Sequence, residues 1–552
     1  MKEENLNDSN FKIIQPGEVR VRIAPSPTGF LHIGTARTAL FNFLFAKKHK
    51  GVFVLRIEDT DLERSEKEYE NDIIDSLKWL GIEWDEGPIP ISSEYIGDHG
   101  PYRQSERLDS YKKYLEKLLK EDEAYYCFCS EDELEAQRQY RMSTGEAPRY
   151  NGKCAQLKKE EVKKLLDQGK KSVIRFRTSS KKISFEDIVR GKMEFDSNLF
   201  GDIVIAKDLT SPLYNFAVVI DDFEMKISYV IRGEDHLSNT PKQILFQEAL
   251  GFPQPKYAHL PLILGSDRSK LSKRHGSTSV KQYREDGYLP ETLVNFMAFL
   301  GWNPGTEREI YSLNSLIKEF ELQNVQKGGA IFNIRRLDFL NAFYIRQKSV
   351  DKLTELCLPF LIEDGLIIQE FKTKQYPPAY GAKEVVQSYK IAETKEEISF
   401  EFLKNIISIY QERLVKVSEI SGLTDFFFKD KIEYDKELLK WKDMNDKEIK
   451  SSLEKTEKLL SKIKNDDWNK ENLETILIPE AENFGKEIRA IGPPASLGEA
   501  LRAGDRGYLL WPFRIALSGK KASAGPFDIA FILGKEKTLK RIKEALYKIS
   551  NS

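Results

Sequence analysis

The chain has 552 residues, 40% of them hydrophobic, which predicts roughly two to four domains with packed cores. Its 86 basic and 87 acidic side chains leave a net charge of −1. An RNA partner would therefore have to be bound by local basic patches, because the protein as a whole is not positively charged. Four cysteines in so long a chain argue against a disulfide scaffold, and a polar start argues against a secretory leader. The sequence has no apolar run long enough to span a membrane, so we expect a cytoplasmic protein.

The first segment predicts the opening of a parallel α/β sheet. Residues Glu18 to Ala24 alternate polar and β-branched side chains, which indicates a strand, and prolines and a glycine then end it. Apolar residues recur at helical spacing from Ile33 to Lys48, and Val52 to Ile57 predicts a second strand. Because amides at a helix start favour anions, His32-Ile-Gly34 is a candidate phosphate-binding turn, although alone such a motif more often forms only a helix cap.

The middle of the chain changes character twice. From Tyr125 to about Leu199, charged helices and short strands indicate an insertion between two halves of a sheet. We then expect strands at Ile203 to Ala206, Phe216 to Ile220 and Ile227 to Ile231, and a helix from Thr240 to near Gly251. The Ser- and Lys-rich stretch Lys270 to Gly276 predicts a mobile loop, which by itself is an ordinary surface feature.

The last part of the chain predicts amphipathic helices from about Gln347. Thr373 to Lys383, with two prolines, predicts a loop or small insertion, and Ala503 to Ser552 predicts two apolar helices separated at Ser518-Gly519. Trp511 and Phe513 are candidates for stacking on RNA bases, but their helical spacing favours a place in the core.

Read together, these segments resemble the class I aminoacyl-tRNA synthetases, and within them bacterial glutamyl-tRNA synthetase. His32-Ile-Gly-Thr35 resembles the HIGH signature, and Lys270-Leu-Ser-Lys-Arg274 resembles the KMSKS signature. Further matches occur in family order at Arg22 to Gly29, Arg56 to Asp61, Tyr102 to Ser105, Pro148 to Tyr150, Val230 to Asp235 and Thr240 to Lys242. The resemblance weakens after Arg346 and returns near Arg514 to Gly519 and Leu533 to Glu536.

The resemblance implies an α/β fold: a Rossmann-like parallel-sheet catalytic domain with an inserted acceptor-binding subdomain, followed by an all-α anticodon-binding domain. From periodicity alone, the last domain is predicted only to be helical. We place the boundaries at a polar extension (1–18), the first catalytic half (19–124), the insertion (125–199), the second catalytic half (200–265), the KMSKS-like loop with a helical stem-contact region (266–346), and the anticodon-binding domain (347–552).

Amino-acid activation is attack by the substrate's own carboxylate on the α-phosphorus of ATP, so it requires alignment and charge neutralisation rather than a protein nucleophile. The resemblance implies that His32 donates to a phosphate oxygen and that Lys270 and Lys273 close over the leaving pyrophosphate. Mg²⁺ is expected to accompany ATP. The residues expected to contact ATP are Thr28, His32, Gly34, Thr35, His236 and Lys273.

Glutamate carries a second carboxylate that must be distinguished from the amide of glutamine, and a planar guanidinium does so by charge and by two parallel hydrogen bonds. Arg22 is the predicted selector, and Glu58 is predicted to accept the substrate ammonium. The alternative is that these two residues only form an ion pair between adjacent strands. The full predicted glutamate site is Arg22, Ala24, Ser26, Glu58, Tyr214 and Arg232.

Three of the four cysteines lie in the predicted insertion, as Cys127-Phe-Cys129 and Cys154. Some members of the family carry a zinc knuckle of this shape, but the position of the last ligand is Gln156 here, and Tyr150 would be an unusual oxygen donor. We therefore expect an incomplete site without tightly bound zinc, and thiols that act as small core residues remain an alternative. Cys357 is predicted to be a core residue.

The predicted function is ATP-dependent ligation of L-glutamate to the 3′ end of tRNA-Glu through glutamyl-adenylate, by a monomer that contacts the acceptor end and the anticodon. Whether tRNA-Gln is also charged stays open. Ala24-Pro-Ser-Pro-Thr-Gly29 and the helical tail argue against a glutaminyl-tRNA synthetase. The long segment after Arg346 argues against a glutamyl-queuosine relative or a small nucleotidyltransferase, and intact signature motifs argue against a non-catalytic relative.

Overall fold

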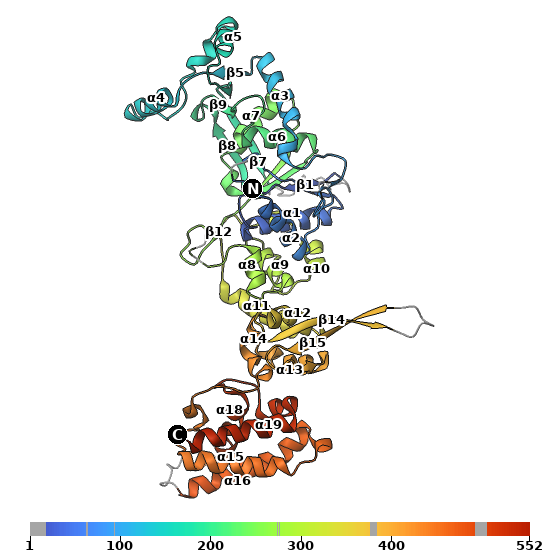
Figure 1. Cartoon of the computed structure of the whole chain (residues 1–552). Coiled ribbons are helices and arrows are strands. Elements are labelled where there is room, and N and C mark those ends of the chain that lie inside the picture. The colour runs from blue at the N-terminus through green and yellow to red at the C-terminus, as the bar shows by residue number, and fades with distance from the viewer. Residues whose placement is uncertain are drawn as a thin grey trace, which may run out of the picture. The chain divides into compact units, whose positions relative to one another are not determined.

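The structure is a computed structural model that describes residues 18–61, 64–92, 94–272, 274, 276–375, 383–491 and 505–551. It divides into two compact units, Met1–Leu337 and Asp338–Ser552, whose elements are labelled in Figure 1. Lys273 lies outside the described residues, as does the predicted N-terminal extension as far as residue 17.

The predicted opening of the sheet is confirmed. Strand β1 (Arg20–Ile23) is followed by helix α1 (Ile33–Lys48) and by strand β2 (Val52–Leu55), and β1 pairs with β2 in parallel. Helix α1 is buried along nearly its whole length, as expected of a helix that is apolar on most sides. Strand β2 ends at Leu55 rather than at Ile57, which forms an isolated bridge with Arg103.

Two further parallel strands lie beside this pair. Strand β10 (Tyr229–Gly233) lies beside β1, where the amide of Ser228 donates to the carbonyl of Arg20 at 3.0 Å, and β11 (Lys256–Leu260) pairs with β10 in parallel. The carboxyl ends of these strands therefore share one edge, which is where open α/β sheets bind ligands. The core beside them gathers side chains of α3 (Leu108–Lys120), α6 (Tyr214–Glu224) and α7 (Thr240–Leu250).

One predicted strand is wrong. Phe216 to Ile220 belongs to helix α6, and Tyr214 is the first residue of that helix rather than part of a strand. A short apolar run is compatible with a buried helix as well as with a strand, so periodicity could not separate them. Helix α7 begins at Thr240 as predicted, and strand β9 (Ile203–Ala206) is also confirmed, although it pairs antiparallel with β6 (Val173–Phe176).

The segment predicted as an insertion is joined to the sheet by hydrogen bonds. Strand β7 (Lys182–Asp187) pairs with β11 and with β8 (Gly191–Asp196), which gives the order β10-β11-β7-β8. Strand β5 (Ala124–Cys127) joins β6 and β9 in a second sheet. Helices α4 (Glu131–Ser143) and α5 (Lys159–Asp167) contribute no buried residue and lie at one end of this unit (Figure 1).

The rest of the first unit consists of helices and short strands. These are α2 (Lys67–Trp79), β3 (Gly87–Pro88), β4 (Tyr95–Ile96), β12 (Ile263–Leu264), α8 (Val280–Glu285), α9 (Pro290–Ala298), α10 (Leu313–Glu319), β13 (Ala330–Ile331) and α11 (Ile334–Arg346), within which the two units divide.

The second unit is mainly helical, as predicted. Its helices are α12 (Val350–Glu363), α13 (Phe400–Ser408), α14 (Glu419–Thr424), α15 (Asp446–Ser461), α16 (Lys470–Ile491), α18 (Gly507–Ser518) and α19 (Pro526–Ser550). Cys357 on α12 is fully buried, as predicted. Phe513 is also fully buried, whereas Trp511 is half-buried and packs against Trp441.

The expectation of a purely helical second half was wrong in one place. Strands β14 (Ile367–Gln375), β15 (Lys383–Ile391) and β16 (Glu397–Ile398) form an antiparallel sheet, whose first two strands extend away from the neighbouring helices (Figure 1). Thr373 to Gln375 and Lys383 are therefore strand residues rather than loop, and residues 376–382 lie outside the described residues.

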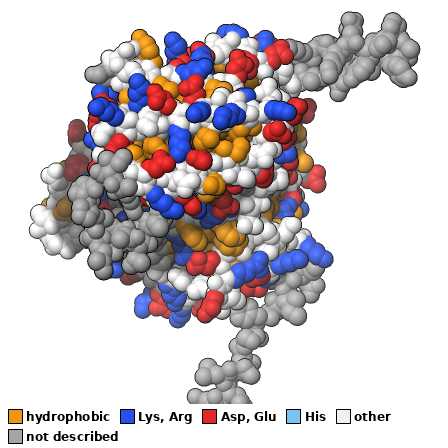
Figure 2. Space-filling model, turned by 90° about the horizontal axis from the view of Figure 1, so that it is seen from below, with side chains coloured by type: hydrophobic (Ala, Val, Ile, Leu, Met, Phe, Trp, Pro, Cys, Tyr) orange, Lys and Arg blue, Asp and Glu red, His pale blue; other side chains and the backbone are white. Residues whose placement is uncertain are grey.

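The surface matches the balanced composition. Figure 2 shows Lys and Arg side chains interspersed with Asp and Glu side chains on the face that it displays. Among the described residues, no helix combines the length and the apolar character that a membrane span requires.

Candidate active site

A cavity of about 610 Å³ lies at the carboxyl ends of β1 and β10 and beside the start of α1. This is the sheet edge at which α/β folds bind ligands. The predicted site residues that line it are Arg22, Ala24, Ser26, His32, Gly34, Thr35, Glu58, Tyr214, Arg232, His236 and Lys270. Of the others, Lys273 lies outside the described residues, and Thr28 is exposed on the turn after β1 without lining the cavity.

His32 both caps helix α1 and lines the cavity. Its Nδ1 accepts a hydrogen bond from the amide of Gly34 at 3.0 Å, so in the neutral ring the proton must lie on Nε2. Burial lowers the pKa of His32, and the nearby charge of Lys270 lowers it further. A Cβ atom at Gly34 would lie 3.1 Å from His32 Nδ1, a tight contact that would press on this ring. His32 therefore caps helix α1 through Nδ1 and, as a neutral ring, can donate a hydrogen bond from Nε2 in the cavity.

Lys270 also lines the cavity and is held by an ion pair. Its Nζ donates to Oδ2 of Asp235 at 3.2 Å, and the lysine side chain is 64% exposed. Asp235 belongs to the short helix η4 (Glu234–His236) that follows β10. An exposed ion pair of this kind contributes little free energy, so Lys270 can exchange Asp235 for another anion.

Arg22 and Glu58 do not form the ion pair that we considered as an alternative; each has another partner. The Nε of Arg22 donates to Oδ1 of Asp222 at 3.1 Å, and Nη2 of Arg56 donates to Oε1 of Glu58 at 3.1 Å. Arg56 also donates to Asp222 at 2.8 Å, so one aspartate fixes both arginines. Burial raises the pKa of Glu58, although the charges of Arg56 and Arg22 oppose this shift.

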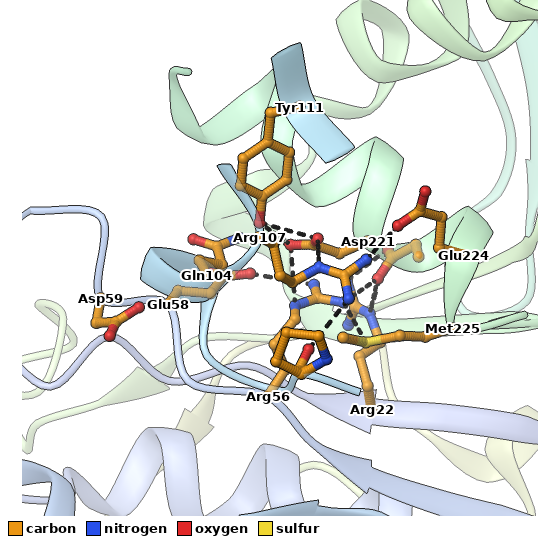
Figure 3. Close-up of polar contacts among 12 residues, drawn as sticks. Arg22, Arg56, Glu58, Asp59, Gln104, Arg107, Tyr111, Asp221, Glu224 and Met225 are labelled. Atoms are coloured by element: carbon orange, nitrogen blue, oxygen red, sulfur yellow. Dashed lines mark hydrogen bonds and ion pairs between the residues drawn. The ribbon is translucent and has the colours of Figure 1, made fainter. Parts of the chain in front are cut away.

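Further buried ion pairs surround Arg22 and Arg56. The side chains of Arg22, Arg56 and Arg107 come from three segments and converge in one buried network (Figure 3). Asp221 of α6 accepts from Arg107 at 2.6 Å and from the hydroxyl of Tyr111 at 2.9 Å. Sequence reasoning missed this network. The available signal was Asp221-Asp222 within an apolar run, which is unusual for a core segment unless the charges are paired.

Tyr214, Arg232 and His236 form another wall of the cavity. The Oη of Tyr214 lies 3.1 Å from Nδ1 of His236. Burial, together with the charge of Arg232, lowers the pKa of His236 to about 4, so this ring is neutral near pH 7. Arg232 donates from Nε to Nε2 of His259 at 3.2 Å. Sequence reasoning gave His259 no role, and the structure places it in contact with a cavity residue.

The cysteines of the insertion form a cluster away from this cavity. The Sγ atoms of Cys127, Cys129 and Cys154 all lie within 4.8 Å of one another. The hydroxyl of Tyr150 lies 3.5 Å from the first sulfur and 3.4 Å from the second, and it accepts from the amide of Cys154 at 2.9 Å. The Tyr150 hydroxyl therefore lies beside the three sulfurs, whereas Gln156 is exposed. Three sulfurs and one oxygen match the donor number of a four-coordinate zinc site.

Comparisons with known proteins cover both units. Residues 18–339 match the model of the catalytic domain of class I tRNA synthetases (E and Q), and residues 352–496 and 505–546 match an anticodon binding domain. The chain is 46% identical to "Glutamate--tRNA ligase 1" of Caldicellulosiruptor saccharolyticus, over 95% of this chain and 98% of that protein. It is 44% identical to "Glutamate--tRNA ligase" of Carboxydothermus hydrogenoformans, over 95% and 99% respectively.

A solved structure of a glutamate tRNA ligase is also similar to this chain. The crystal structure of a glutamate tRNA ligase from Elizabethkingia meningosepticum, in complex with its amino acid, is similar with a TM-score of 0.77 and 33% identity, and the match covers 96% of this chain and 100% of that one. With family models matching both units and relatives aligned over nearly their full length, this chain belongs to the class I tRNA synthetases of the glutamate and glutamine (E and Q) group.

Proposed function

We propose that the protein ligates L-glutamate to the 3′ end of tRNA-Glu, using ATP and passing through glutamyl-adenylate. The observation that carries this proposal is the shared cavity: Arg22 and Arg232, two of the three buried guanidinium groups that line it, lie there together with a neutral histidine donor at a helix start. Such a cavity suits a substrate with two carboxylates beside a nucleoside triphosphate.

In the activation step, the α-carboxylate of glutamate attacks the α-phosphorus and pyrophosphate leaves. His32 donates from Nε2 to a phosphate oxygen on which negative charge builds up. Lys270 leaves Asp235 and, with Lys273, neutralises the departing pyrophosphate. Mg²⁺ would accompany ATP, with substrate phosphates and water among its ligands, and would help to neutralise the phosphate charge. The nucleotide contacts are Thr28, His32, Gly34, Thr35, His236 and Lys273.

In the glutamate site, Arg22 binds the side-chain carboxylate, and Glu58 accepts the substrate ammonium. Asp222 supports both assignments, because it bonds Arg22 directly and reaches Glu58 through Arg56. Arg232 adds a second guanidinium for the substrate carboxylates. The remaining contacts of the proposed site are Ala24, Ser26 and Tyr214.

We propose that different regions of the chain contact different parts of the tRNA. We assign the acceptor end to the region 125–199 and the anticodon to the region 347–552, where the anticodon-domain match lies. The protein is proposed to act in the cytoplasm, where its tRNA partner is used in translation, and to be a monomer, as the family resemblance implies. Charging of tRNA-Gln as well as tRNA-Glu is the alternative function.

The cysteine cluster is proposed to hold a structural zinc ion. Our expectation of an incomplete site rested on Gln156 and on tyrosine being an unusual zinc ligand; the proposed fourth donor is the Tyr150 hydroxyl, which lies 3.4 Å from Cys129 Sγ. A bound ion would fix β5 and the loop around Cys154 to each other, since the ligands come from both segments.

The test of the function is charging with labelled amino acids. The purified protein is incubated with ATP, labelled glutamate or glutamine, and transcripts of tRNA-Glu or tRNA-Gln, and pyrophosphate exchange is measured with and without RNA. We expect glutamate to be transferred to tRNA-Glu, and exchange to require the tRNA. Transfer of glutamine, or no glutamate transfer to either transcript, would contradict the proposal. Transfer of glutamate to both transcripts would establish the alternative.

A further inference from the structure

We propose that Asp187 and His259 are positioning residues for Arg232, and that uncharged acceptors hold this guanidinium so that its positive charge remains available to an anionic substrate. This inference rests on the proposed function, because it concerns how the cavity binds glutamate. It adds two buried residues outside the predicted site and assigns a role to β7, a strand of the inserted segment.

The hydrogen-bond partners of Arg232 carry the argument. Its Nε donates to His259 Nε2 at 3.2 Å, and its Nη2 donates to Thr240 Oγ1 and to Gln243 Oε1, each at 2.8 Å. An imidazole, a hydroxyl and an amide are all uncharged acceptors. Among the described residues, no carboxylate forms an ion pair with Arg232, although the residue is only 5% exposed.

The other guanidinium of the proposed glutamate site is held differently. Arg22 is paired with the carboxylate of Asp222, so much of its charge is balanced before a substrate arrives. A carboxylate at hydrogen-bond distance offsets a buried positive charge strongly, because the low local dielectric strengthens the attraction. Arg232 lacks such a partner, and it therefore contributes the less-compensated positive charge of the two.

His259 can accept from Arg232 only in one neutral form. Its Nδ1 lies 2.6 Å from Oδ2 of Asp187, and a carboxylate accepts but does not donate, so Nδ1 carries the hydrogen. The lone pair of Nε2 then faces two donors, Arg232 Nε at 3.2 Å and the Thr240 hydroxyl at 3.0 Å, and is shared between them. Asp187 is itself fixed, since its Oδ1 accepts from the amides of Val189 and Arg190 at 3.0 and 2.8 Å. Both side chains of this pair are fully buried.

The sheet topology brings these groups together. Asp187 ends strand β7 and pairs with Tyr257 of β11, two residues before His259, and His259 lies opposite Arg232 in the parallel register of β11 and β10. A strand from the inserted segment therefore supplies the carboxylate that sets the histidine tautomer next to the cavity.

The decisive variant is Gln243→Glu. It keeps the size of the side chain and places a carboxylate at the position of an amide oxygen 2.8 Å from Arg232. Gln247→Glu is the matched control, because Gln247 is one turn later on α7, is similarly buried and contacts Tyr257 rather than Arg232. KM for glutamate, KM for ATP and kcat are measured in tRNA-Glu charging, together with the melting temperature of each variant.

We expect Gln243→Glu to raise KM for glutamate by about tenfold or more and to change KM for ATP by less than about twofold, because the new carboxylate competes with the substrate only. Gln247→Glu should leave both values near those of the unmodified protein. Equal effects of the two variants on KM for glutamate, or a parallel rise in KM for ATP, would overturn the inference. If the unmodified protein does not charge tRNA-Glu with glutamate, the proposed function fails instead.

A second pair of variants tests the histidine and keeps the proposal testable if Gln243→Glu does not fold. His259→Gln retains a neutral acceptor for Arg232, and His259→Leu removes it. We expect the leucine variant to have a KM for glutamate at least about fivefold higher than the glutamine variant, at similar KM for ATP. Equal KM values for glutamate in the two variants would mean that His259 only fills space.

Discussion

Arg22 and Asp222, which lie 200 residues apart in the chain, form a buried ion pair in which Nε of the arginine is 3.1 Å from Oδ1 of the aspartate. The same aspartate binds Arg56, which in turn binds Glu58. One carboxylate on α6 therefore orients the group proposed to bind the side chain of glutamate and, through a second arginine, the group proposed to bind its ammonium.

Replacing Arg22 should remove glutamate use without removing RNA binding. We expect Arg22→Ala to lower kcat/KM for glutamate by about 10²–10³-fold or more, because a buried charged hydrogen-bond partner of the substrate is lost. Affinity for tRNA-Glu, measured by filter binding, should stay nearly unchanged.

The matched control for this experiment is Arg20→Ala. Arg20 is on the same strand and forms a part-buried ion pair with Glu86 at 2.9 Å, but it does not line the cavity. Both variants should melt at lower temperature, and only Arg22→Ala should lose glutamate use. A normal charging rate for Arg22→Ala would remove the argument for its role in specificity.

The outcome for individual residues shows what the sequence could predict. The strand–helix–strand start at β1, α1 and β2 depends on local periodicity, and it was predicted correctly. The supports of the site depend on partners far away in the chain: Arg56 and Asp222 are 166 residues apart, and Asp187 and His259 are 72 apart. Local patterns do not show which residues pair over such distances, so the roles of Asp222 and His259 were missed.

The errors in the fold have a related cause. Helix α6 was predicted as a strand because five apolar residues in a row fit a buried strand and a buried helix equally well. The sheet of β14, β15 and β16 was missed because it lies among amphipathic helices and its strands carry many charged residues. For α6, tertiary packing decided the structure.

His32 has two roles that one substitution can separate. Asparagine is a favourable N-cap residue, so His32→Asn should preserve the start of α1 and the melting temperature. It is too short to replace the Nε2 donor, and the loss of such a donor costs about 10²–10³-fold in kcat. We expect this loss in glutamate-dependent pyrophosphate exchange. If His32→Asn exchanges pyrophosphate normally, the histidine serves only as a helix cap.

The cysteine cluster should contain metal in the purified protein. Because three thiols and the Tyr150 hydroxyl converge, we expect about one zinc ion per chain by elemental mass spectrometry. Tyr150→Phe should lose zinc faster during dialysis against a chelator. Cys357→Ser is the control, since that thiol is buried on α12 outside the cluster and its loss should leave the zinc content unchanged. Protein without zinc after growth in zinc-supplied medium would support the original expectation of an incomplete site.

The neutral ring of His236 predicts a dependence of stability on pH. Burial and the charge of Arg232 lower the pKa of His236 from 6.5 to about 4 in the folded protein. Below pH 6.5 the unfolded chain therefore binds a proton that the folded chain does not, so the free energy of unfolding falls as the pH drops from about 6.5 towards about 4. Glutamine at this position cannot take up the proton. We expect the loss of stability between pH 7.5 and 5 to be smaller in His236→Gln by on the order of 1 kcal/mol, measured by urea unfolding at both values. The other buried histidines add the same pH slope to both proteins, so the difference between the two proteins reports on His236 alone. Identical pH slopes would show that this ring is protonated equally in the folded and unfolded chains.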